Sequence, residues 1–277
     1  MQIMQNEGDK RTLFDLLVNE RFDTQQAIRL VSMATELADL VAINTSPHES
    51  SRPLAEHLSE RFEHYDADAQ IFPYTQQMDG VEQCNLVIDV ANKQATEQVV
   101  VSGHLDTVAI DEDFLSLETD SERPYFGRSE VKPQHDGDAL CMYGMGTNDM
   151  KNVFAVMLQL LKERAYAHDP DLFRQDTGWL ADHERYESIL QECRFTDPFK
   201  DATNGLRFAA TAGEEAAGHE GMKCLLAQCP ELAASTVWLI AEPSSGLADS
   251  HKGYSAARVL SGSLEEMLDF IVVAQER

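Results

Sequence analysis

The chain has 277 residues, of which 48 are acidic and 22 are basic, and its formal net charge is −26 at pH 7. This length is enough to bury a sizeable core, in one large domain or in two smaller ones. So acidic a chain disfavours nucleic acid and anionic membranes as partners, because Lys and Arg are needed to neutralise their phosphates.

The first third of the chain is predicted to contain helices followed by strands. Apolar residues recur at helical spacing across residues 11–43, which predicts amphipathic helices. Another helix is predicted to begin near Ser51, with Pro53 in its first turn. The strands predicted after it are 69–74, 85–90 and 98–102.

The rest of the chain alternates between helices and strands. Residues 110–139 are acidic and aperiodic, which predicts a loop, and a long helix is predicted from Asp149 to about Ala165. The elements predicted next are a strand at 206–212, a helix near 219–228 and a strand at 236–241. This alternation predicts an α/β fold, with a mainly parallel sheet and helices on both of its faces.

Residues 168–204 separate the long helix from the next strand. A direct connection between a helix and a strand usually has about 2–6 residues. The segment is therefore predicted to be an insertion, with a helix of its own from Trp179 to about Cys193.

The cysteines and the apolar segments bear on the cellular compartment. The five cysteines include no Cys-x-x-Cys pair, which disfavours a disulfide framework and a thiolate zinc site. The amino terminus has no apolar segment after a basic stretch, so no signal peptide is predicted. No apolar run approaches the roughly 20 residues that span a bilayer. We therefore expect a cytoplasmic protein.

Metal-ligating side chains follow three predicted strands, at the point where each strand ends. His104 and Asp106 follow the first, the Glu214–Glu215 pair follows the second, and Glu242 follows the third. Sites in open α/β sheets are built beyond the carboxyl ends of the strands. The sequence therefore predicts one shared metal site, although a surface histidine and solvated acids are the alternative for each motif alone.

Particular roles follow from the chemistry of these side chains. Asp106 lies two residues beyond His104 and can supply a carboxylate that accepts from the other nitrogen of its imidazole, or brace the site. In the acidic pair, one carboxylate can ligate a metal while the other faces the substrate as a general base. Asp149 stands after Gly144 and Gly146 at a helix start, where it can bridge two cations or simply cap the helix.

Four motifs resemble the family of zinc-dependent aminoacylases, acetylornithine deacetylases and succinyl-diaminopimelate desuccinylases. They occur in the order of the family, and the similarity spans roughly residues 24–250. The motifs are SGHLDTV at 102–108, DGDALCMYGMGTNDMK at 136–151, TAGEEAAGHEGM at 211–222 and AEPS at 241–244.

This resemblance implies a cofactor and a role for each site residue. The implied Zn²⁺ ligands are His104, Asp149 and Glu242 for one ion, and Asp149 with Glu215 for a second. Asp149 is implied to bridge two zinc ions, for which Co²⁺ or Mn²⁺ can substitute. Glu214 is the implied general base, and Asp106 the residue that orients His104. The implied reaction is hydrolysis of an amide bond in an N-acyl amino acid or small peptide, by a water that zinc activates.

The resemblance also implies a domain organisation. Residues 1–248, with the insertion 168–204, correspond to the catalytic domain, and residues 249–277 to the start of a lid and dimerisation domain. The family has a further histidine ligand near its carboxyl terminus, whereas no histidine follows His251 here. We therefore expect a chain truncated in its lid, with one or two zinc sites, of which about one holds its ion tightly.

Two functions remain open at this point. The first is a hydrolase, which a partner chain or a second copy in a homo-oligomer would complete with the missing ligand. The alternative is a truncated or degenerate homologue that binds zinc, is catalytically inactive and acts through association. Glu214 favours the hydrolase, because a protein without catalysis has no reason to keep a base beside its ligands.

Overall fold

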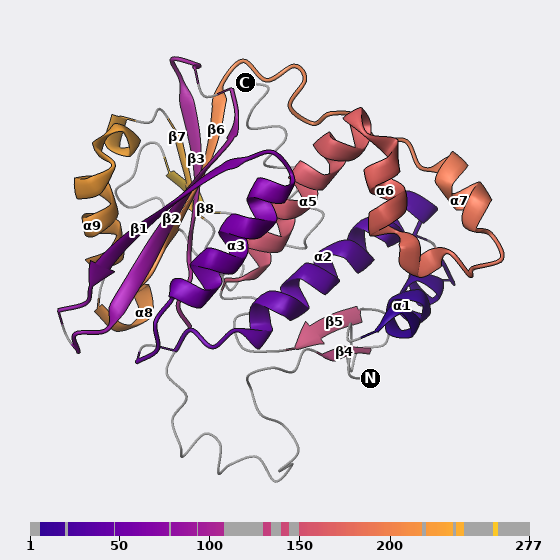
Figure 1. Ribbon diagram of the computed structural model, residues 1–277, viewed down its shortest axis with the longest axis horizontal. Helices are drawn as coiled ribbons and strands as arrows, with labels where there is room; N and C mark the ends of the chain where they lie inside the picture. The colour runs from indigo at the N-terminus through magenta and orange to yellow at the C-terminus, as the bar shows by residue number, and fades with distance from the viewer. Residues whose placement is uncertain are drawn as a thin grey trace, which may run out of the picture.

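The computed structural model describes eleven stretches of the chain. They are residues 6–19, 22–46, 48–77, 79–92, 94–107, 130–133, 140–143, 150–217, 220–234, 237–240 and 257–259. Within these stretches, helices cover both faces of a six-stranded sheet (Figure 1). The predicted α/β class and the placing of helices on both faces are confirmed for this part of the chain.

The sheet is mixed, so the prediction of a mainly parallel sheet was wrong. Its strand order is β1-β2-β6-β3-β7-β8, and β6, β3, β7 and β8 run parallel. The strands are β1 (Asp68–Thr75), β2 (Glu82–Ala91), β3 (Gln98–His104), β6 (Gly205–Thr211), β7 (Val237–Ile240) and β8 (Ala257–Val259). β2 pairs antiparallel with both β1 and β6. The short turn between β1 and β2 explains the first of these pairings, since a tight connection can only join antiparallel strands.

That turn has a glycine where the backbone requires one. Gly80 adopts a φ of 76°, a left-handed conformation that costs glycine little. The amide of Gln76 donates to the carbonyl of Val81 across the turn, at 2.9 Å. The sequence predicted both strands, at 69–74 and 85–90, but the direction of their pairing depends on this local geometry.

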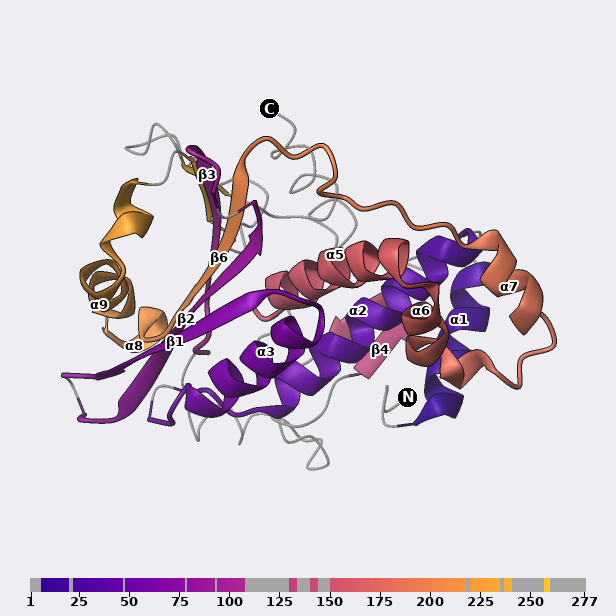
Figure 2. The same cartoon turned by 45° about the horizontal axis from the view of Figure 1, so that its top comes forward.

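The helices lie in two layers. The α2, α3 and α5 helices pack on one side of the sheet, and α9 lies on the other (Figure 2). The α-helices are α1 (Glu7–Asn19), α2 (Thr24–Ala42), α3 (Arg52–His64), α5 (Asn152–His168), α6 (Pro170–Asp176), α7 (Tyr186–Glu192), α8 (Glu214–Ala217) and α9 (Glu220–Gln228). The 3-10 helices are η1 (Gly178–Leu180) and η2 (Pro230–Ala234). Among the described residues, no helix has the length and apolar character that crossing a membrane requires.

The loop predicted at 110–139 falls largely outside the described residues, and the described part of it is not a loop. β4 (Glu130–Pro133) pairs antiparallel with β5 (Leu140–Tyr143) in a separate two-stranded ribbon. A polar four-residue strand has too little apolar periodicity to be recognised without its partner.

Two buried clusters join the sheet to its helices. The larger one fills the space between the sheet and α2, α3 and α5, and the stacked rings of Phe62 and Phe208 lie in it, 6.0 Å apart. On the opposite face, Val87, Val100 and Ala209 of the sheet contact Leu225 of α9. Successive side chains of β2 and β3 point to opposite faces of the sheet, so they contact different helical layers.

The predicted insertion packs with the first helix of the chain. Its α6, η1 and α7 form a third cluster with α1 and α2, in which the ring of Phe14 meets Trp179 edge-on at 6.0 Å. The helix predicted from Trp179 to Cys193 is broken, because η1 ends at Leu180 and α7 begins at Tyr186.

A buried ion-pair network joins α2, α3 and α5. The carboxylate of Glu36 accepts hydrogen bonds from Lys162, at 2.6 Å, and from Arg61. Burial has the largest single influence on the pKa of Glu36 and raises it, but the two cations together outweigh burial and lower the pKa from 4.5 to about 2. The folded state therefore favours the ionised carboxylate.

This shift predicts acid sensitivity. Because the pKa of Glu36 is lower in the folded state, its contribution to stability is complete above about pH 4.5 and is lost as the pH falls towards 2. We expect this loss to lower the free energy of unfolding by about 3 kcal/mol over that pH range. Urea unfolding at pH 6, 4 and 3 would measure the loss. An equally steep loss in Glu36→Gln would contradict the assignment to this carboxylate.

Candidate metal centre

The candidate site lies where parallel strands of the sheet end. In the register of the sheet, His104 at the end of β3 pairs with Thr211 at the end of β6, and Ser102 pairs with Ile240 at the end of β7. These three strands therefore end at one edge of the sheet. The expectation that their ends share an edge is confirmed for the described residues.

Three of the predicted residues come together at this edge. His104, Glu214 and Glu215 each offer a ligand atom, and these atoms lie within 4.8 Å of one another. His104 is buried, with 2% of its surface exposed, while the two glutamates are half-buried. Zinc bonds of about 2.0–2.2 Å keep two ligands of one ion within about 4.4 Å of each other, so the three groups lie close together on the scale of a metal site.

The imidazole of His104 is held through its Nδ1 atom. Nδ1 lies 2.8 Å from the main-chain carbonyl oxygen of Asp106. A carbonyl only accepts hydrogen bonds, so Nδ1 carries the hydrogen, and in the neutral ring Nε2 is the atom able to ligate a metal. Histidine ligands of metals are commonly fixed in this way, through the other ring nitrogen.

The carboxylate of Asp106 binds the acidic pair. Its Oδ2 accepts a hydrogen bond from the amide of Glu215 at 2.8 Å, and its Oδ1 accepts one from the amide of Glu214 at 3.2 Å. Oδ1 lies farther from Nδ1 of His104, at 3.8 Å. Asp106 therefore orients His104 chiefly through its main chain, while its side chain caps the first turn of α8.

Of the two roles predicted for the carboxylate of Asp106, the contact with His104 is made by the main-chain carbonyl instead, and the carboxylate itself braces the acidic pair. The sequence does hold a signal for the observed arrangement, because an aspartate is a preferred acceptor for the amides at a helix start. The signal is hidden because Asp106 and Glu214 are far apart in the chain and α8 is only one turn long.

Two predicted ligands, Asp149 and Glu242, lie outside the described residues, and so does His251, the last histidine of the chain. Met150, next to Asp149, and Ile240, two residues before Glu242, are described. The amide of His104 donates to Sδ of Met150 at 3.2 Å, and Ile240 ends β7 beside β3. A Cβ atom at Gly103 would lie 3.0 Å from Val153 and 3.1 Å from Met150, so the glycine lets the start of α5 approach the end of β3 closely.

Lys151 is a residue that sequence reasoning missed. Its side chain is fully buried, and Nζ donates to the carbonyls of Leu40 at 3.0 Å and Ile43 at 2.7 Å. Burial lowers the pKa of Lys151 to about 7. The contact joins the start of α5 to the carboxyl end of α2, where the carbonyl of Leu40 also accepts from the amide of Ile43, the residue that caps the helix.

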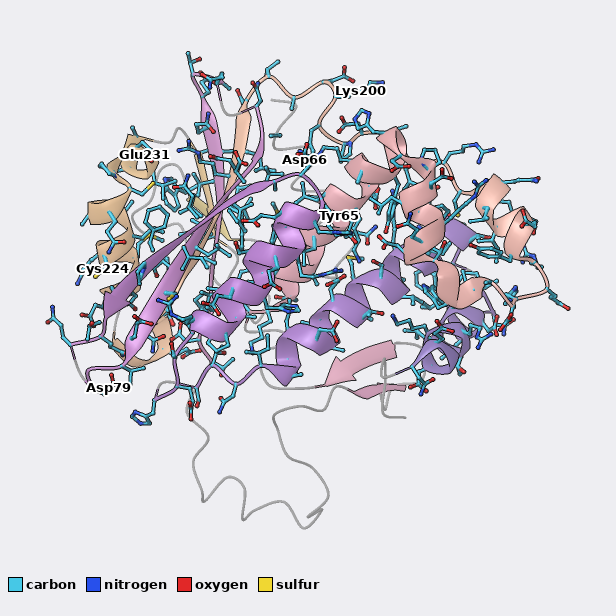
Figure 3. The ribbon with its side chains drawn as sticks, viewed as in Figure 1. Tyr65, Asp66, Asp79, Lys200, Cys224 and Glu231 are labelled. Atoms are coloured by element: carbon cyan, nitrogen blue, oxygen red, sulfur yellow. The ribbon has the colours of Figure 1, made fainter. Side chains whose placement is uncertain are left out.

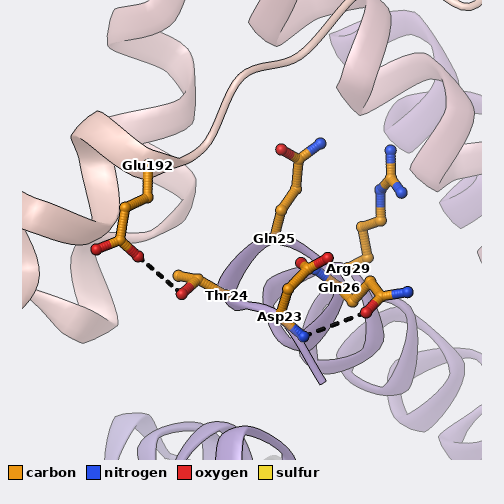
Figure 4. A pocket seen from close by; sticks show the side chains of 6 residues that line it. All are labelled: Asp23, Thr24, Gln25, Gln26, Arg29 and Glu192. Atoms are coloured by element: carbon orange, nitrogen blue, oxygen red, sulfur yellow. Dashed lines mark hydrogen bonds between the residues drawn. The ribbon is translucent and has the colours of Figure 1, made fainter. Parts of the chain in front are cut away.

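A separate hollow of about 400 Å³ lies at the other end of α2 (Figure 4). Its lining is polar, with Thr24 bound to Glu192 and the side chain of Asp23 capping α2 through the amide of Gln26. A helix of 19 residues is about 28 Å long, so the hollow is remote from His104. Its lining groups already serve the local structure.

Comparisons with known proteins give similarities of structure only. No protein-family model matches the chain, and a search of curated proteins finds no match. Among solved structures, a tripeptidase from Staphylococcus aureus is 17% identical, with a TM-score of 0.45 over 77% of this chain and 43% of its own. Human carnosine dipeptidase 1 is 13% identical, with a TM-score of 0.49 over 84% and 41%.

A Zn-dependent exopeptidase from Parabacteroides distasonis is 10% identical, with a TM-score of 0.43 over 88% of this chain and 80% of its own. The chain spans less than half the length of the tripeptidase and of the dipeptidase. With identities below 25% and TM-scores below 0.5, these similarities establish neither the family nor the activity of the chain.

Proposed function

We propose that the chain is a zinc-dependent hydrolase that cleaves the amide bond of an N-acyl amino acid or a small peptide. The observation that carries the proposal is the meeting of His104, Glu214 and Glu215 at one edge of the sheet. An imidazole beside carboxylates is a donor set that suits zinc. The main-chain contact of His104 Nδ1 supports it, because that contact directs Nε2 to act as the ligand atom.

Each residue has a proposed role. His104 and Glu215, with Asp149 and Glu242, would hold the metal. When bound, zinc polarises a carbonyl group and lowers the pKa of water. Glu214 would accept the proton of the attacking water on a carboxylate oxygen and pass it to the nitrogen of the leaving amine. Asp106 would keep the two glutamates in place through their amides.

The proposed substrate is a small molecule. This part of the proposal is supported by the resemblance of the motifs to those of N-acyl amino acid hydrolases. A panel of N-acetyl amino acids, N-succinyl amino acids and dipeptides would separate a deacylase from a dipeptidase. The mass of the assembly in solution, measured alongside, would test the proposed homo-oligomer. Zinc binding with no turnover on any member of the panel would favour the alternative, a zinc-binding homologue that acts through association.

Metal removal gives a direct prediction. Dialysis against a chelator should abolish hydrolysis, and addition of Zn²⁺ or Co²⁺ should restore it, because the proposed site loses its Lewis acid and nothing else. Circular dichroism before and after dialysis would show that the fold survives the treatment. Full activity in a chain shown to be free of metal would contradict the proposal.

A further inference from the structure

Two buried polar side chains of the sheet converge on the segment that carries the acidic pair. Asn85 of β2 is fully buried, and Tyr74 of β1 is 8% exposed. Neither residue belongs to the proposed metal site. Both bind the main chain of Ala212, two residues before Glu214. Their side chains join four elements, β1, β2, α9 and the end of β6.

The contacts of Asn85 use both ends of its amide. Its Oδ1 accepts from the amide of Ala212 at 3.0 Å, and its Nδ2 donates to the carbonyl of Gly221 at 3.0 Å. One contact requires an acceptor and the other a donor, so the orientation of the amide is fixed. Asn85 thereby bonds the end of β6 to the first turn of α9.

Tyr74 fixes Ala212 through its other main-chain group. The hydroxyl of Tyr74 donates to the carbonyl of Ala212 at 2.8 Å. The amide and the carbonyl of Ala212 therefore both form hydrogen bonds with buried side chains, one from β2 and one from β1. We call this arrangement of Tyr74, Asn85 and Ala212 the Ala212 bridge.

Gly221 allows the helix to approach the bridge. A Cβ atom at this position would overlap the carbonyl oxygen of Ala212 and lie 2.9 Å from its carbonyl carbon and 3.0 Å from Oδ1 of Asn85. The backbone of Ala212 cannot yield as a flexible side chain could. α9 has a further contact at each end: Glu220 accepts from the amide of Gln77, in the turn after β1, and Gln228 donates to the carbonyl of Pro73 in β1.

The geometry points to a positioning role: we propose that Tyr74 and Asn85 set the placement of Glu214 and Glu215 by fixing Ala212. Only Gly213, with a φ of 76°, stands between the bridge and Glu214. Beyond it, the carboxylate of Asp106 holds the amides of both glutamates. The turn is therefore anchored on both sides, and loosening either anchor moves the carboxylates. This proposal rests on the proposed function for its consequence in metal binding.

The test uses Tyr74→Phe, which removes one hydroxyl and keeps the ring, and Asn85→Ala, which removes both amide contacts. Two quantities would be measured on the full chain. They are the exchange rates of the Glu214 and Glu215 amides by NMR, and the affinity and visible absorption spectrum of bound Co²⁺. We expect amide exchange about three- to tenfold faster in Tyr74→Phe, as for the loss of one hydrogen bond, with weaker Co²⁺ binding and an altered spectrum. Asn85→Ala should show larger changes.

Tyr65→Phe is a matched control. Its hydroxyl is also buried and donates at 2.8 Å, but to Asp176. Figure 3 shows Tyr65 beside α3, with Cys224 of α9 on the other side of the sheet. This variant should lose stability and leave both readouts at the site unchanged, which separates a positioning role from a general loss of stability.

The outcomes distinguish the two proposals. Unchanged amide exchange and Co²⁺ binding in Tyr74→Phe would overturn the positioning role, even if Asn85→Ala fails to fold. If the unaltered chain binds no Co²⁺, the proposed function is overturned, while the exchange rates of the two amides still decide whether the bridge fixes the turn. If amide exchange became faster in Tyr65→Phe to the same extent as in Tyr74→Phe, the positioning role would also be overturned.

Discussion

Glu214→Gln is expected to lower turnover by about 10²–10⁴-fold while leaving zinc binding almost intact. An amide has nearly the shape of the carboxylate but cannot accept the proton of the attacking water. The change should therefore remove the proposed base without removing a ligand. Steady-state kinetics and metal analysis of the same sample would test both parts.

Glu187→Gln provides the control for this variant. Glu187 is an exposed residue of α7, in the predicted insertion, and its substitution removes the same negative charge as Glu214→Gln. It should keep full turnover and full metal content. Loss of metal in Glu214→Gln would make Glu214 a ligand and reverse the assignment of the pair, leaving Glu215 as the candidate base.

Lys162→Met is expected to reduce the free energy of unfolding by about 3 kcal/mol. Lys162 and Glu36 are both almost fully buried, and Nζ also donates to Ser32 at 2.9 Å. Removing the cation leaves the buried carboxylate of Glu36 with Arg61, which is one-third exposed, as its remaining charge partner, and a buried charge that loses a partner is costly. Denaturant unfolding at pH 7 would measure the change.

An exposed ion pair gives the comparison. Nη1 of Arg174 and Oδ1 of Asp171 lie 2.9 Å apart, and 60% and 77% of the two side chains are exposed, respectively. Arg174→Met should change the free energy of unfolding by less than about 1 kcal/mol, since water screens such pairs. Equal losses in the two variants would show that burial does not set the strength of the Glu36 network.

Much of the fold was predictable from periodicity. Helical spacing in residues 11–43 predicted the region of α1 and α2, and Pro53 marked the first turn of α3. Apolar runs predicted β3, β6 and β7. The helices are decided by the burial of one face, and β3 and β6 by the burial of both faces, which gives continuous apolar runs. The break between η1 and α7, by contrast, depends on packing against α1.

The candidate site was predictable in part. His104, Glu214 and Glu215 follow predicted strands, and the carboxyl ends of parallel strands lie at one edge of a sheet. The meeting of these three residues was therefore predictable. The atoms that hold this site were not predictable. The carboxylate contacts of Asp106 and the bonds of Asn85 join segments far apart in sequence, and a buried asparagine in an apolar strand gives no sign of its partners.

The most direct test is an anomalous diffraction map at the zinc edge, from crystals of the chain grown with Zn²⁺. We predict an ion about 2.0–2.1 Å from Nε2 of His104, with Asp149, Glu215 and Glu242 as the carboxylates around this site. The same experiment on His104→Ala should show no ion there. An ion bound elsewhere in the unaltered chain, with Nε2 of His104 contacting only protein atoms, would contradict the account.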